Sequence, residues 1–404
     1  MIYQGWTYRG SMTRVRDPIH NYINLDAMSE ELLDTARVQR LRRIHQLGTG
    51  NLVYPGANHT RFEHSLGAYH LAGEAARALS LSDDERKAVQ AAALLHDVGH
   101  GPFSHTADPL YRDFLHKTHE DLTIEALQKG ILPDILRKHG VEPDHVAALV
   151  RGEGALGKLV SGDLDVDRMD YLVRDSHYTG VHIGVDLERL VTDLVLTPQG
   201  IAVRHGSVPA AEMLLVTRVQ MYATVYFHRT LRVAERMIER AFRLALDAGE
   251  IKPEQLPQMD DAAATMMLRH SKTDAWKFIL GVDQRKLYKV ALEEGMGDHR
   301  EESVADLSEN IERQTRIEQE IAQAAKIPAR DVILDVPEPP SIPEIETKVL
   351  YDDGSVRGLD EASTLTRSLG AAQRDHWRLR VIVPPSRRTD AGAVAGKILA
   401  RELS

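Results

Sequence analysis

The sequence predicts a mainly α-helical protein with short β-hairpins and a small α+β region towards its C-terminal end. Three observations predict this class. Apolar residues recur at helical spacing from about Ser29 to Leu246. A cluster of prolines at positions 337, 339, 340 and 343 then indicates a linker. Beyond it, short apolar runs flank turn residues, as is typical of strands.

The first 30 residues are expected to form a short extended arm, with "RDPIHNYINL" as a hairpin or turn. Two capping-box patterns, Thr60 with Glu63 and Ser82 with Glu85, predict the starts of helices over 61–79 and 83–98. The second helix becomes almost wholly apolar at "AVQAAALL", which predicts burial on all sides. The stretch "GHGP" that follows is expected to end it.

Further along, 193–206 is predicted to be a hairpin, 209–247 a long helix, and 260–325 helical with charged faces. The stretch "ETKVLYDDGSVRGL" predicts a hairpin, and "WRLRVIVPP" predicts a strand. These elements suggest three segments. We expect an arm and helical core over 1–250, a helical extension over 251–330, and a linker with a small α+β region over 331–404.

The composition limits which partners and which metal ligands the protein is expected to use. A chain of 404 residues exceeds one average domain, and its net charge of −10 argues against nucleic acid as the main partner. There are no cysteines, so any metal must be held by His, Asp or Glu. No apolar stretch reaches membrane-spanning length and no leader pattern is visible, so a cytoplasmic location without membrane contact is expected.

Histidines gather in one quarter of the chain. Of the 19 histidines, 11 lie between His45 and His145. Within "AALLHDVGHGPFSH", His96 and Asp97 end the apolar helix. A single buried histidine is usually a hydrogen-bonded core residue, but a buried carboxylate beside it must be paired or bound to metal. The pattern therefore favours a metal site.

Two other segments can complete that site. His64 heads a helical face of small residues, which predicts that it points inward. The stretch "SGDLDVDRMDYLVRD" resembles a calcium loop, but Arg168 and Arg174 stand where such a loop needs Gly and Glu. Asp167, Tyr171 and Arg174 share a helical face instead, which suits the wall of a site or, equally, a solvated charged face. His64, His96, Asp97 and Asp167 thus make a candidate two-histidine, two-aspartate site for Mn, Fe, Mg, Zn, Ni or Co.

The order of these motifs resembles that of the HD-domain metal-dependent phosphohydrolases. The resemblance is nearest to the branch of deoxynucleoside triphosphate (dNTP) triphosphohydrolases that also carry a sterile-alpha-motif domain, and to their prokaryotic relatives. That additional domain is not expected here. The similar segments are "DPIH" (17–20), "DTARVQRLRRIHQLG" (34–48), "YPGANHTRFEHSLG" (54–67), "LLHDVGHGPFSH" (94–105), "THE" (118–120), "DVDRMDYLVRD" (165–175) and "HRTLR" (228–232).

The resemblance implies an HD-domain helical core, an activity and a set of roles. The implied reaction cleaves a dNTP at the α-phosphorus into a deoxynucleoside and tripolyphosphate. A divalent metal ion is the implied cofactor, held by the four residues named above. His100, Asp108 and His119 match the family's proton-handling network, and a His held by an Asp can protonate a leaving oxygen near neutral pH. For His105 we expect a structural role.

The resemblance also implies how the substrate is held. The matching positions for phosphate and sugar contacts are Gln46, Leu47, Arg61, Arg168, Tyr171, Asp175, Arg218 and Tyr226. Arg168 stands where relatives often carry Lys, so a guanidinium fork replaces a point charge. Arg218 and Tyr226 are spaced i, i+8 and would share one helix face. Without the resemblance, Arg168 and Arg218 are equally explained as solvated surface charges.

Regulation is a further implication. Asp34, Gln39 and Arg42 match an allosteric nucleotide site between subunits, and Asp and Arg suit the edges of guanine. An activating dGTP and a homotetramer are therefore expected partners. The same segment also suits an ordinary amphipathic helix with exposed charges. Arg16 replaces a common Asn of the regulatory pocket.

Two other functions remain open at the level of sequence. The first is an HD phosphohydrolase or phosphodiesterase acting on another nucleotide. The second is a nucleotide sensor with little catalysis, against which the full set of ligands and proton-handling histidines argues.

Overall fold

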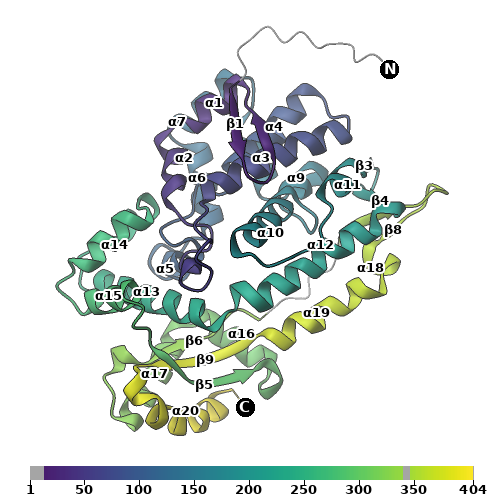
Figure 1. The fold of residues 1–404 in the computed structure, drawn as a ribbon. Coiled ribbons are helices and arrows are strands. Elements are labelled where there is room, and N and C mark those ends of the chain that lie inside the picture. Colours follow the sequence, from purple (N-terminus) through teal and green to yellow (C-terminus); the bar gives the residue numbers. More distant parts are fainter. Residues whose placement is uncertain (1–12, 340–345, 404) are drawn as a thin grey trace.

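The computed structural model describes residues 13–339 and 346–403, and it is mainly helical with small sheets, as the sequence predicts (Figure 1). The N-terminal core is built from α1 (Ala27–Leu33), α2 (Ala36–Arg40), α3 (Arg61–Ala78), α4 (Asp83–Leu95), α5 (Asp108–Leu115), α6 (His119–Gln128), α7 (Ile131–Lys138), α8 (Pro143–Val150), α9 (Gly154–Val160), α10 (Val166–Thr179), α11 (Leu187–Thr192) and α12 (Val208–Met221).

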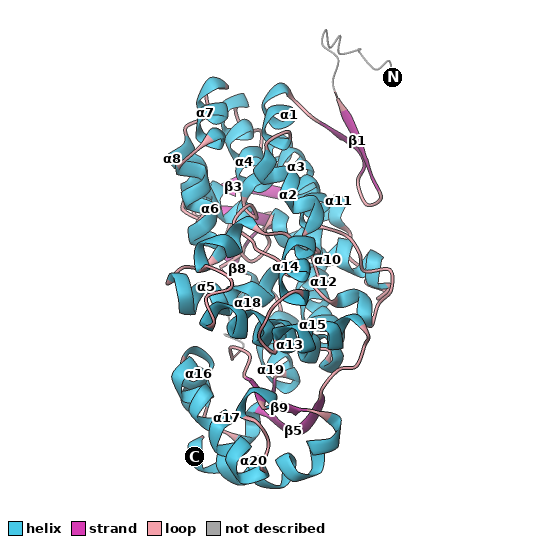
Figure 2. Ribbon diagram, turned by 90° about the vertical axis from the view of Figure 1, so that its left-hand side faces the viewer, coloured by secondary structure: helices cyan, strands magenta, loops and turns pink. Residues whose placement is uncertain are grey.

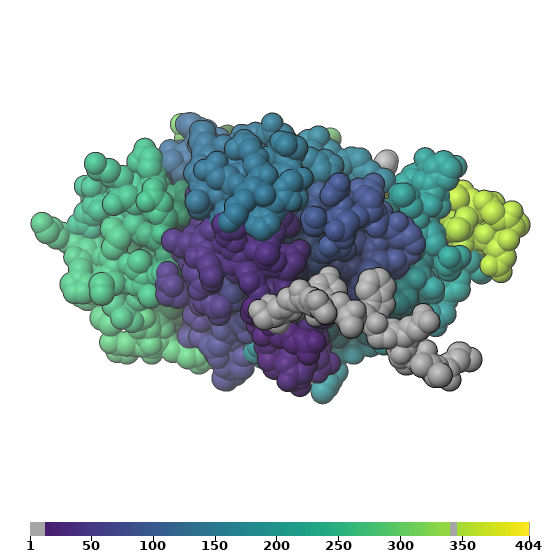
Figure 3. All heavy atoms as spheres, turned by 90° about the horizontal axis from the view of Figure 1, so that it is seen from above, coloured from purple at the N-terminus to yellow at the C-terminus, as the bar shows by residue number. Residues whose placement is uncertain are grey.

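A β-hairpin of β1 (Arg14–Asp17) and β2 (Asn21–Asn24) precedes these helices and confirms the predicted turn around "DPIH". Asp17 pairs with Asn21 at its closed end. Residues 1–12 of the expected arm lie outside the described residues. Seen from above, the N-terminal half of the chain forms most of the visible face, with α14 and α15 at one end (Figure 3).

Three helices position the histidines and aspartates of the core. α3 packs along α4 on one side and along α10 on the other. Both capping boxes predicted for α3 and α4 are present, so Thr60 and Ser82 set where the helices begin. The apolar half of α4 is buried from Ala88 to Leu95, as the sequence predicts. One continuous apolar core joins the three helices to the rest of the bundle.

The single long helix predicted over 209–247 is wrong. α12 ends at Met221, a π-helical turn η5 covers Tyr222–Tyr226, and α13 (Arg229–Asp247) begins after His228. His228 has an extended ψ of 125° and its ring accepts a hydrogen bond from the amide of Thr230. The Tyr226 hydroxyl donates to Asp175, so a tertiary contact holds the widened turn that local propensity does not reveal.

The helical stretch predicted over 260–325 is also interrupted. α14 (Asp261–Arg269) and α15 (Ala275–Asp283) are followed by the strand β5 (Lys289–Gly295), and helices resume with α16 (Glu301–Glu309) and α17 (Ile311–Ala325). β5 pairs antiparallel with β9 (Arg378–Val383), which in turn pairs with β6 (Ile333–Asp335). The long-range pairing decides the conformation of β5.

A four-stranded sheet contains the other two predicted hairpins. β3 (Leu194–Thr197) and β4 (Gly200–Arg204) confirm the first, and β7 (Lys348–Leu350) and β8 (Val356–Gly358) confirm the second. β4 and β7 then pair in parallel, so the sheet order is β3-β4-β7-β8. This pairing joins the segments predicted as 1–250 and 331–404. Pro340 and Pro343 of the predicted linker lie outside the described residues.

The remaining C-terminal elements are α18 (Leu359–Ala362), α19 (Thr364–His376) and α20 (Arg388–Glu402). Helices α17 and α20 pack on the β5-β9-β6 sheet around the fully buried Trp377, at the opposite end of the molecule from β1 (Figure 2). We call α16, α17, α20 and the β5-β9-β6 sheet the C-terminal module, and most of its buried apolar side chains form a cluster of their own. Among the described residues, no helix is long and apolar enough to cross a membrane.

Candidate metal centre and active site

The segment after α4 turns two polar side chains towards α3 and α10. α4 ends at Leu95, three residues earlier than predicted, so His96 and Asp97 lie in the turn that follows the helix. Thr123 explains the early end because its hydroxyl donates to the carbonyl of His96 and accepts from the amide of Gly99. These bonds replace helical ones and aim His96 and Asp97 at α3 and α10.

Imidazole and carboxylate groups from α3, α10 and the turn after α4 converge there. The Nε2 atom of His64, on α3, lies 3.2 Å from Nε2 of His96 and 2.9 Å from Oδ1 of Asp167, on α10. Asp97 adjoins them, with Oδ1 3.3 Å from Nε2 of His96 and Oδ2 3.8 Å from Nε2 of His64. His64 and Asp97 are buried, and Asp167 is the most exposed of the four.

The hydrogen-bond partners of both imidazoles show that this cluster suits a cation. Nδ1 of His64 faces the carboxylate of Asp170, and Nδ1 of His96 faces the carbonyl of Ala93. Both partners only accept hydrogen bonds, so each Nδ1 carries a proton and each Nε2 is the nitrogen that can bind a cation. One donor atom from each of His64, His96 and Asp167 lies within 4.8 Å of the others, and Asp97 lies at the edge of this group. A divalent cation satisfies such a set of nitrogen and oxygen donors.

Arg61 lies at the edge of the cluster, one turn before His64. Its guanidinium donates to Oδ2 of Asp97 over 2.6 Å and to the hydroxyl of Ser104 over 2.8 Å. Although burial opposes ionisation, the charges of Arg61 and His96 hold the pKa of Asp97 well below its usual range. The remaining guanidinium nitrogen of Arg61 is buried without a protein partner, so it is available to a phosphate oxygen.

A second cluster of His100, His105, Asp108 and His119 adjoins the first. Nε2 of His100 lies 3.3 Å from Oδ1 of Asp97, and its ring stacks on that of His119 with centroids 3.8 Å apart. Asp108 lies 3.2 Å from Nδ1 of His119. The structure therefore brings the three predicted proton-handling residues together, beside Asp97.

His105 was expected to be structural, but its side chain is 69% exposed and lies 2.9 Å from Asp108. Its ring centroid is 5.0 Å from that of His100. The Asp108 carboxylate thus holds His105 as well as His119. The sequence signal that could have found it is its three-residue spacing from Asp108 across a short helical turn.

Gly99 allows the helix that carries His119 to come close. A Cβ at Gly99 would lie 2.1 Å from the carbonyl oxygen of His119 and 2.5 Å from the amide of Thr123. Only glycine lets the N-terminal turn of α6 approach the chain after α4 this closely.

Polar side chains form a wall on the other side of the cluster. Asp175 accepts from the hydroxyl of Tyr226 and from Nε2 of His59, each over 2.7 Å. The ring of Tyr171 lies between, 6.2 Å from that of His64 and 6.4 Å from that of Tyr226. The sequence did not single out His59, because only the tertiary structure shows that it binds Asp175.

The remaining residues predicted to contact the substrate are Gln46, Leu47, Arg168 and Arg218. The amide oxygen of Gln46 is buried without a protein partner. Arg168 lies 3.3 Å from Asp165, and Arg218 lies over the ring of Tyr222. Leu47 is half-buried against the core. Since η5 interrupts the helix, the face expected for Arg218 and Tyr226 is not that of one regular helix.

Arg174, expected to line the site with Asp167 and Tyr171, is completely buried. It binds Asp17 and Asp170 behind the cluster instead. The i, i+7 spacing that suggested a shared face is correct for α10, but other elements cover the helix at Arg174.

The predicted allosteric residues lie at the surface around α2. Asp34 and Arg42 are exposed, and Gln39 is partly buried. Arg42 donates to the side chain of Gln39 over 2.9 Å and stacks on the ring of Phe62 with its guanidinium carbon 3.6 Å from the ring centre. The segment is thus exposed enough to bind a nucleotide. Its side chains also contact one another as those of an ordinary helix surface do.

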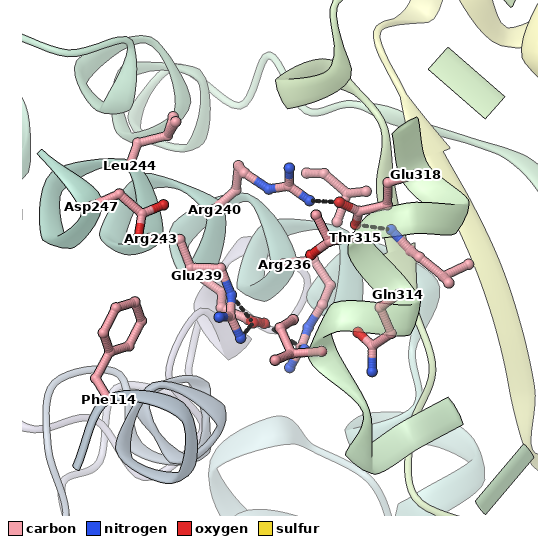
Figure 4. Close-up of a pocket in the computed structure, with 13 residues that line it drawn as sticks. Phe114, Arg236, Glu239, Arg240, Arg243, Leu244, Asp247, Gln314, Thr315 and Glu318 are labelled. Atoms are coloured by element: carbon pink, nitrogen blue, oxygen red, sulfur yellow. Dashed lines mark hydrogen bonds and ion pairs between the residues drawn. The ribbon is translucent and has the colours of Figure 1, made fainter. Parts of the chain in front are cut away.

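A cavity of about 270 Å³ lies apart from these residues, between α13 and the C-terminal module (Figure 4). Its arginines are paired with carboxylates: Arg240 with Glu318 and Arg243 with Glu239. The described residues that line it include no member of either histidine cluster. We interpret this cavity as part of the contact by which the C-terminal module packs on α13.

Comparison with known proteins identifies the family. A model described as "HD domain" matches residues 61–175, and one described as "HD associated region" matches residues 185–403. The chain belongs to the HD-domain phosphohydrolases. The matched HD domain contains all four converging residues and both histidine clusters.

Relatives are found in all three domains of life. The chain is 34% identical over 388 residues to an uncharacterised protein of Methanocaldococcus jannaschii, covering 92% of this chain and 79% of that protein. It is 32% identical over 288 residues to the human deoxynucleoside triphosphate triphosphohydrolase SAMHD1, covering 60% of this chain and 46% of the human protein. The chain thus spans about half the length of the human relative.

A crystal structure of a phosphohydrolase from Bacteroides thetaiotaomicron superposes with a TM-score of 0.73 and 26% identity, covering 92% of this chain and all of that one. An Aquifex aeolicus protein gives a TM-score of 0.74 and 27% identity over 95% of this chain and 99% of that one. Both comparisons support the HD fold. HD domains bind divalent metals, and the histidine–aspartate group found here suits that property.

Proposed function

We propose that this HD phosphohydrolase is a metal-dependent dNTP triphosphohydrolase that releases a deoxynucleoside and tripolyphosphate. The observation that carries the proposal is the direct contact between the two clusters: His100 bonds to Asp97 on one side and stacks on His119 on the other. A candidate metal site and a proton-handling network are thus within reach of one phosphoester.

His64, His96, Asp97 and Asp167 would hold the metal ion. When bound, a divalent ion supplies Lewis acidity towards a phosphoryl oxygen and lowers the pKa of a water molecule. Arg61 fixes Asp97 and presents its free guanidinium nitrogen to the phosphates. Arg168 and Arg218 would add charge against the polyphosphate: Nε of Arg218 is buried without a protein partner, and Arg168 is paired with Asp165 at the edge of the site.

The proton network suits the leaving group. Burial opposes protonation of His119, but the hydrogen bond and charge of Asp108 outweigh it and raise the pKa of His119. Burial and the charge of Arg61 lower the pKa of His100 well below its ordinary value. Protonation is therefore favoured at His119 over His100, and we assign His119 to protonate the 5′ oxygen, with His105 as a second histidine held by Asp108.

The wall of Gln46, Tyr171, Asp175 and Tyr226 supports a sugar as the group on the leaving side. Asp175 already accepts from Tyr226 and His59, and a carboxylate has lone pairs left for a sugar hydroxyl. The buried amide oxygen of Gln46 is a second acceptor. We further propose that Asp34, Gln39 and Arg42 bind dGTP between subunits of a homotetramer.

The test is to incubate the purified protein with each dNTP and each ribonucleotide in the presence of Mn²⁺ or Mg²⁺ and to resolve the products by chromatography. We expect deoxynucleoside and tripolyphosphate as the first products. Pyrophosphate or orthophosphate as the first product would assign the protein to another phosphoester reaction of the family. Tight binding without turnover would indicate a nucleotide sensor. Repeating the assay with added dGTP, and with Arg42→Ala, tests activation separately.

A further inference from the structure

Asp170 lies directly behind the candidate metal centre and is completely buried. Its carboxylate accepts four hydrogen bonds. Oδ2 accepts from Nδ1 of His64 and Nε of Arg174, each over 2.9 Å. Oδ1 accepts from Nε2 of His20 over 2.7 Å and from Arg174 over 3.0 Å. Four donors hold this carboxylate in one orientation, so the ring of His64 is held as well.

The network continues to the N-terminal β-hairpin. Arg174 donates to both oxygens of Asp17, the last residue of β1, over 2.8 and 3.3 Å. Oδ1 of Asp17 also accepts from the amides of Ile19 and His20, over 2.9 and 2.8 Å. The tight turn that Asp17 stabilises therefore presents the ring of His20 to Asp170.

The packing of α3 reserves space for this carboxylate. A Cβ at Gly67, one turn after His64, would lie 1.8 Å from Oδ1 of Asp170 and 2.5 Å from the guanidinium of Arg174. No side chain can be accommodated at that distance. The small residue that the sequence places at Gly67 thus allows α10 to bring Asp170 against His64.

The charges of the network favour a cation at the site. Arg174 lies between the carboxylates of Asp170 and Asp17, and His20 and His64 are the other partners. Two carboxylates thus face a single guanidinium group next to His64. A carboxylate that accepts from the far nitrogen of a ligating imidazole fixes its tautomer and increases its basicity.

We propose that Asp170 is a positioning residue for the metal ligand His64, and that the β1–β2 hairpin, through Asp17 and His20, is part of the apparatus that sets metal affinity. This inference rests on the proposed function only in requiring a metal at the four-residue site. It does not depend on which phosphoester is hydrolysed. Asp17, His20, Asp170 and Arg174 do not themselves reach the metal or the substrate.

The test measures binding of Mn²⁺ alone to the chelator-treated full chain by titration calorimetry, with circular dichroism as the check on folding. Asp170→Asn keeps the shape but removes the charge and offers an amide to one donor. Loss of a carboxylate that supports a metal ligand typically weakens metal binding by about 10- to 100-fold, and we expect that range. His20→Gln removes the ring at the hairpin end without touching His64, and we expect roughly a 3- to 10-fold weaker affinity.

His70→Gln is the matched control. The His70 ring lies against that of His20, tilted by 41° with centroids 4.9 Å apart, yet none of its described hydrogen bonds reaches Asp170. The Mn²⁺ affinity of His70→Gln protein should equal that of the wild type. Folded Asp170→Asn protein that binds Mn²⁺ with wild-type affinity would overturn the proposal. So would His20→Gln protein whose Mn²⁺ affinity equals that of His70→Gln protein. The second result decides the matter even where Asp170→Asn fails to fold. Wild-type protein that binds no Mn²⁺ would instead overturn the metal site and the proposed function.

Discussion

His100 and His119 stack on each other, yet their surroundings shift their pKa values in opposite directions. Asp108 raises the pKa of His119, whereas burial and Arg61 lower that of His100. Two stacked cations would repel each other, so one charged and one neutral ring is the stable arrangement. A donor and a neutral partner thus lie side by side next to Asp97.

Replacing His119 tests this division. His119→Ala should retain the metal but lose turnover by about 10²- to 10⁴-fold, because general acid catalysis typically contributes that much. Metal content by mass spectrometry and kcat on a dNTP are the measurements. His116→Asn is the control, since His116 is exposed and its left-handed backbone tolerates Asn. Wild-type kcat in His119→Ala protein would refute the assignment.

The His45–Asp261 pair gives a prediction for pH. Nδ1 of His45 lies 2.7 Å from the Asp261 carboxylate, whose hydrogen bond raises the pKa of His45 above its ordinary 6.5. Since the folded pKa is the higher one, the pair contributes its full stability below about pH 6.5 and loses it as pH rises through the folded pKa. The Tm of His45→Gln should therefore fall furthest below wild type in acid. A deficit that grows with pH would contradict this.

The four residues of the candidate metal site were predictable from the sequence. The residues that hold them from behind were not. His64, His96, Asp97 and Asp167 stand in motifs whose chemistry is visible in the sequence, and the structure brings them together. Asp170 carries no such signal, because its role depends on Arg174 and His20 reaching it from other segments. His59 was missed for the same reason.

Helix α3 shows how one element serves both packing and the site. Its Thr60–Glu63 capping box sets where it begins, and Gly67 sets how closely α10 approaches. The starts of α3 and α4 were predictable because capping is local. The π-helical turn η5 and the strand β5 were not, since contacts with Asp175 and with β9 determine them.

Two glycine-to-alanine substitutions separate packing from helix propensity. Gly396, in α20, has no atom within 4 Å of an added Cβ, so Gly396→Ala should stabilise the protein by about 0.5–1 kcal/mol. Gly67→Ala gains the same propensity but forces Asp170 aside, and overpacking typically costs about 1–3 kcal/mol. Urea unfolding should therefore give opposite signs for the two variants. Equal stabilisation would show that α3 and α10 relax without cost.

At the scale of the molecule, buried ion pairs fasten the C-terminal module to the core. Asp335, at the end of β6, is fully buried and binds Arg232 of α13 and Arg380 of β9. Only pairing between segments far apart in sequence assembles this contact. That is also why the sequence could predict a small α+β region but not that β5 belongs to it.

Removing Asp335 should be costly. Asp335→Ala removes one carboxylate from Arg232 and Arg380, which keep Glu235 and Glu293 as their other partners. Breaking a buried pair typically costs about 3–5 kcal/mol of unfolding free energy, and we expect the lower end of that range. Asp283→Ala is the control, because its pair with Arg269 is exposed and is expected to contribute at most about 1 kcal/mol. Urea unfolding measures both. Equally small losses would show that the C-terminal module is held by its apolar contacts alone.

We propose that one divalent ion, held by His64, His96, Asp97 and Asp167, is required for hydrolysis of a dNTP. Titrating Mn²⁺ into metal-free protein while recording bound metal and tripolyphosphate release tests it most directly, in wild type and in Asp167→Ala. We predict that turnover rises in step with occupancy of one site per chain, and that Asp167→Ala loses both. Full turnover by metal-free protein, or by Asp167→Ala, would show that a metal ion at this site is not required for hydrolysis.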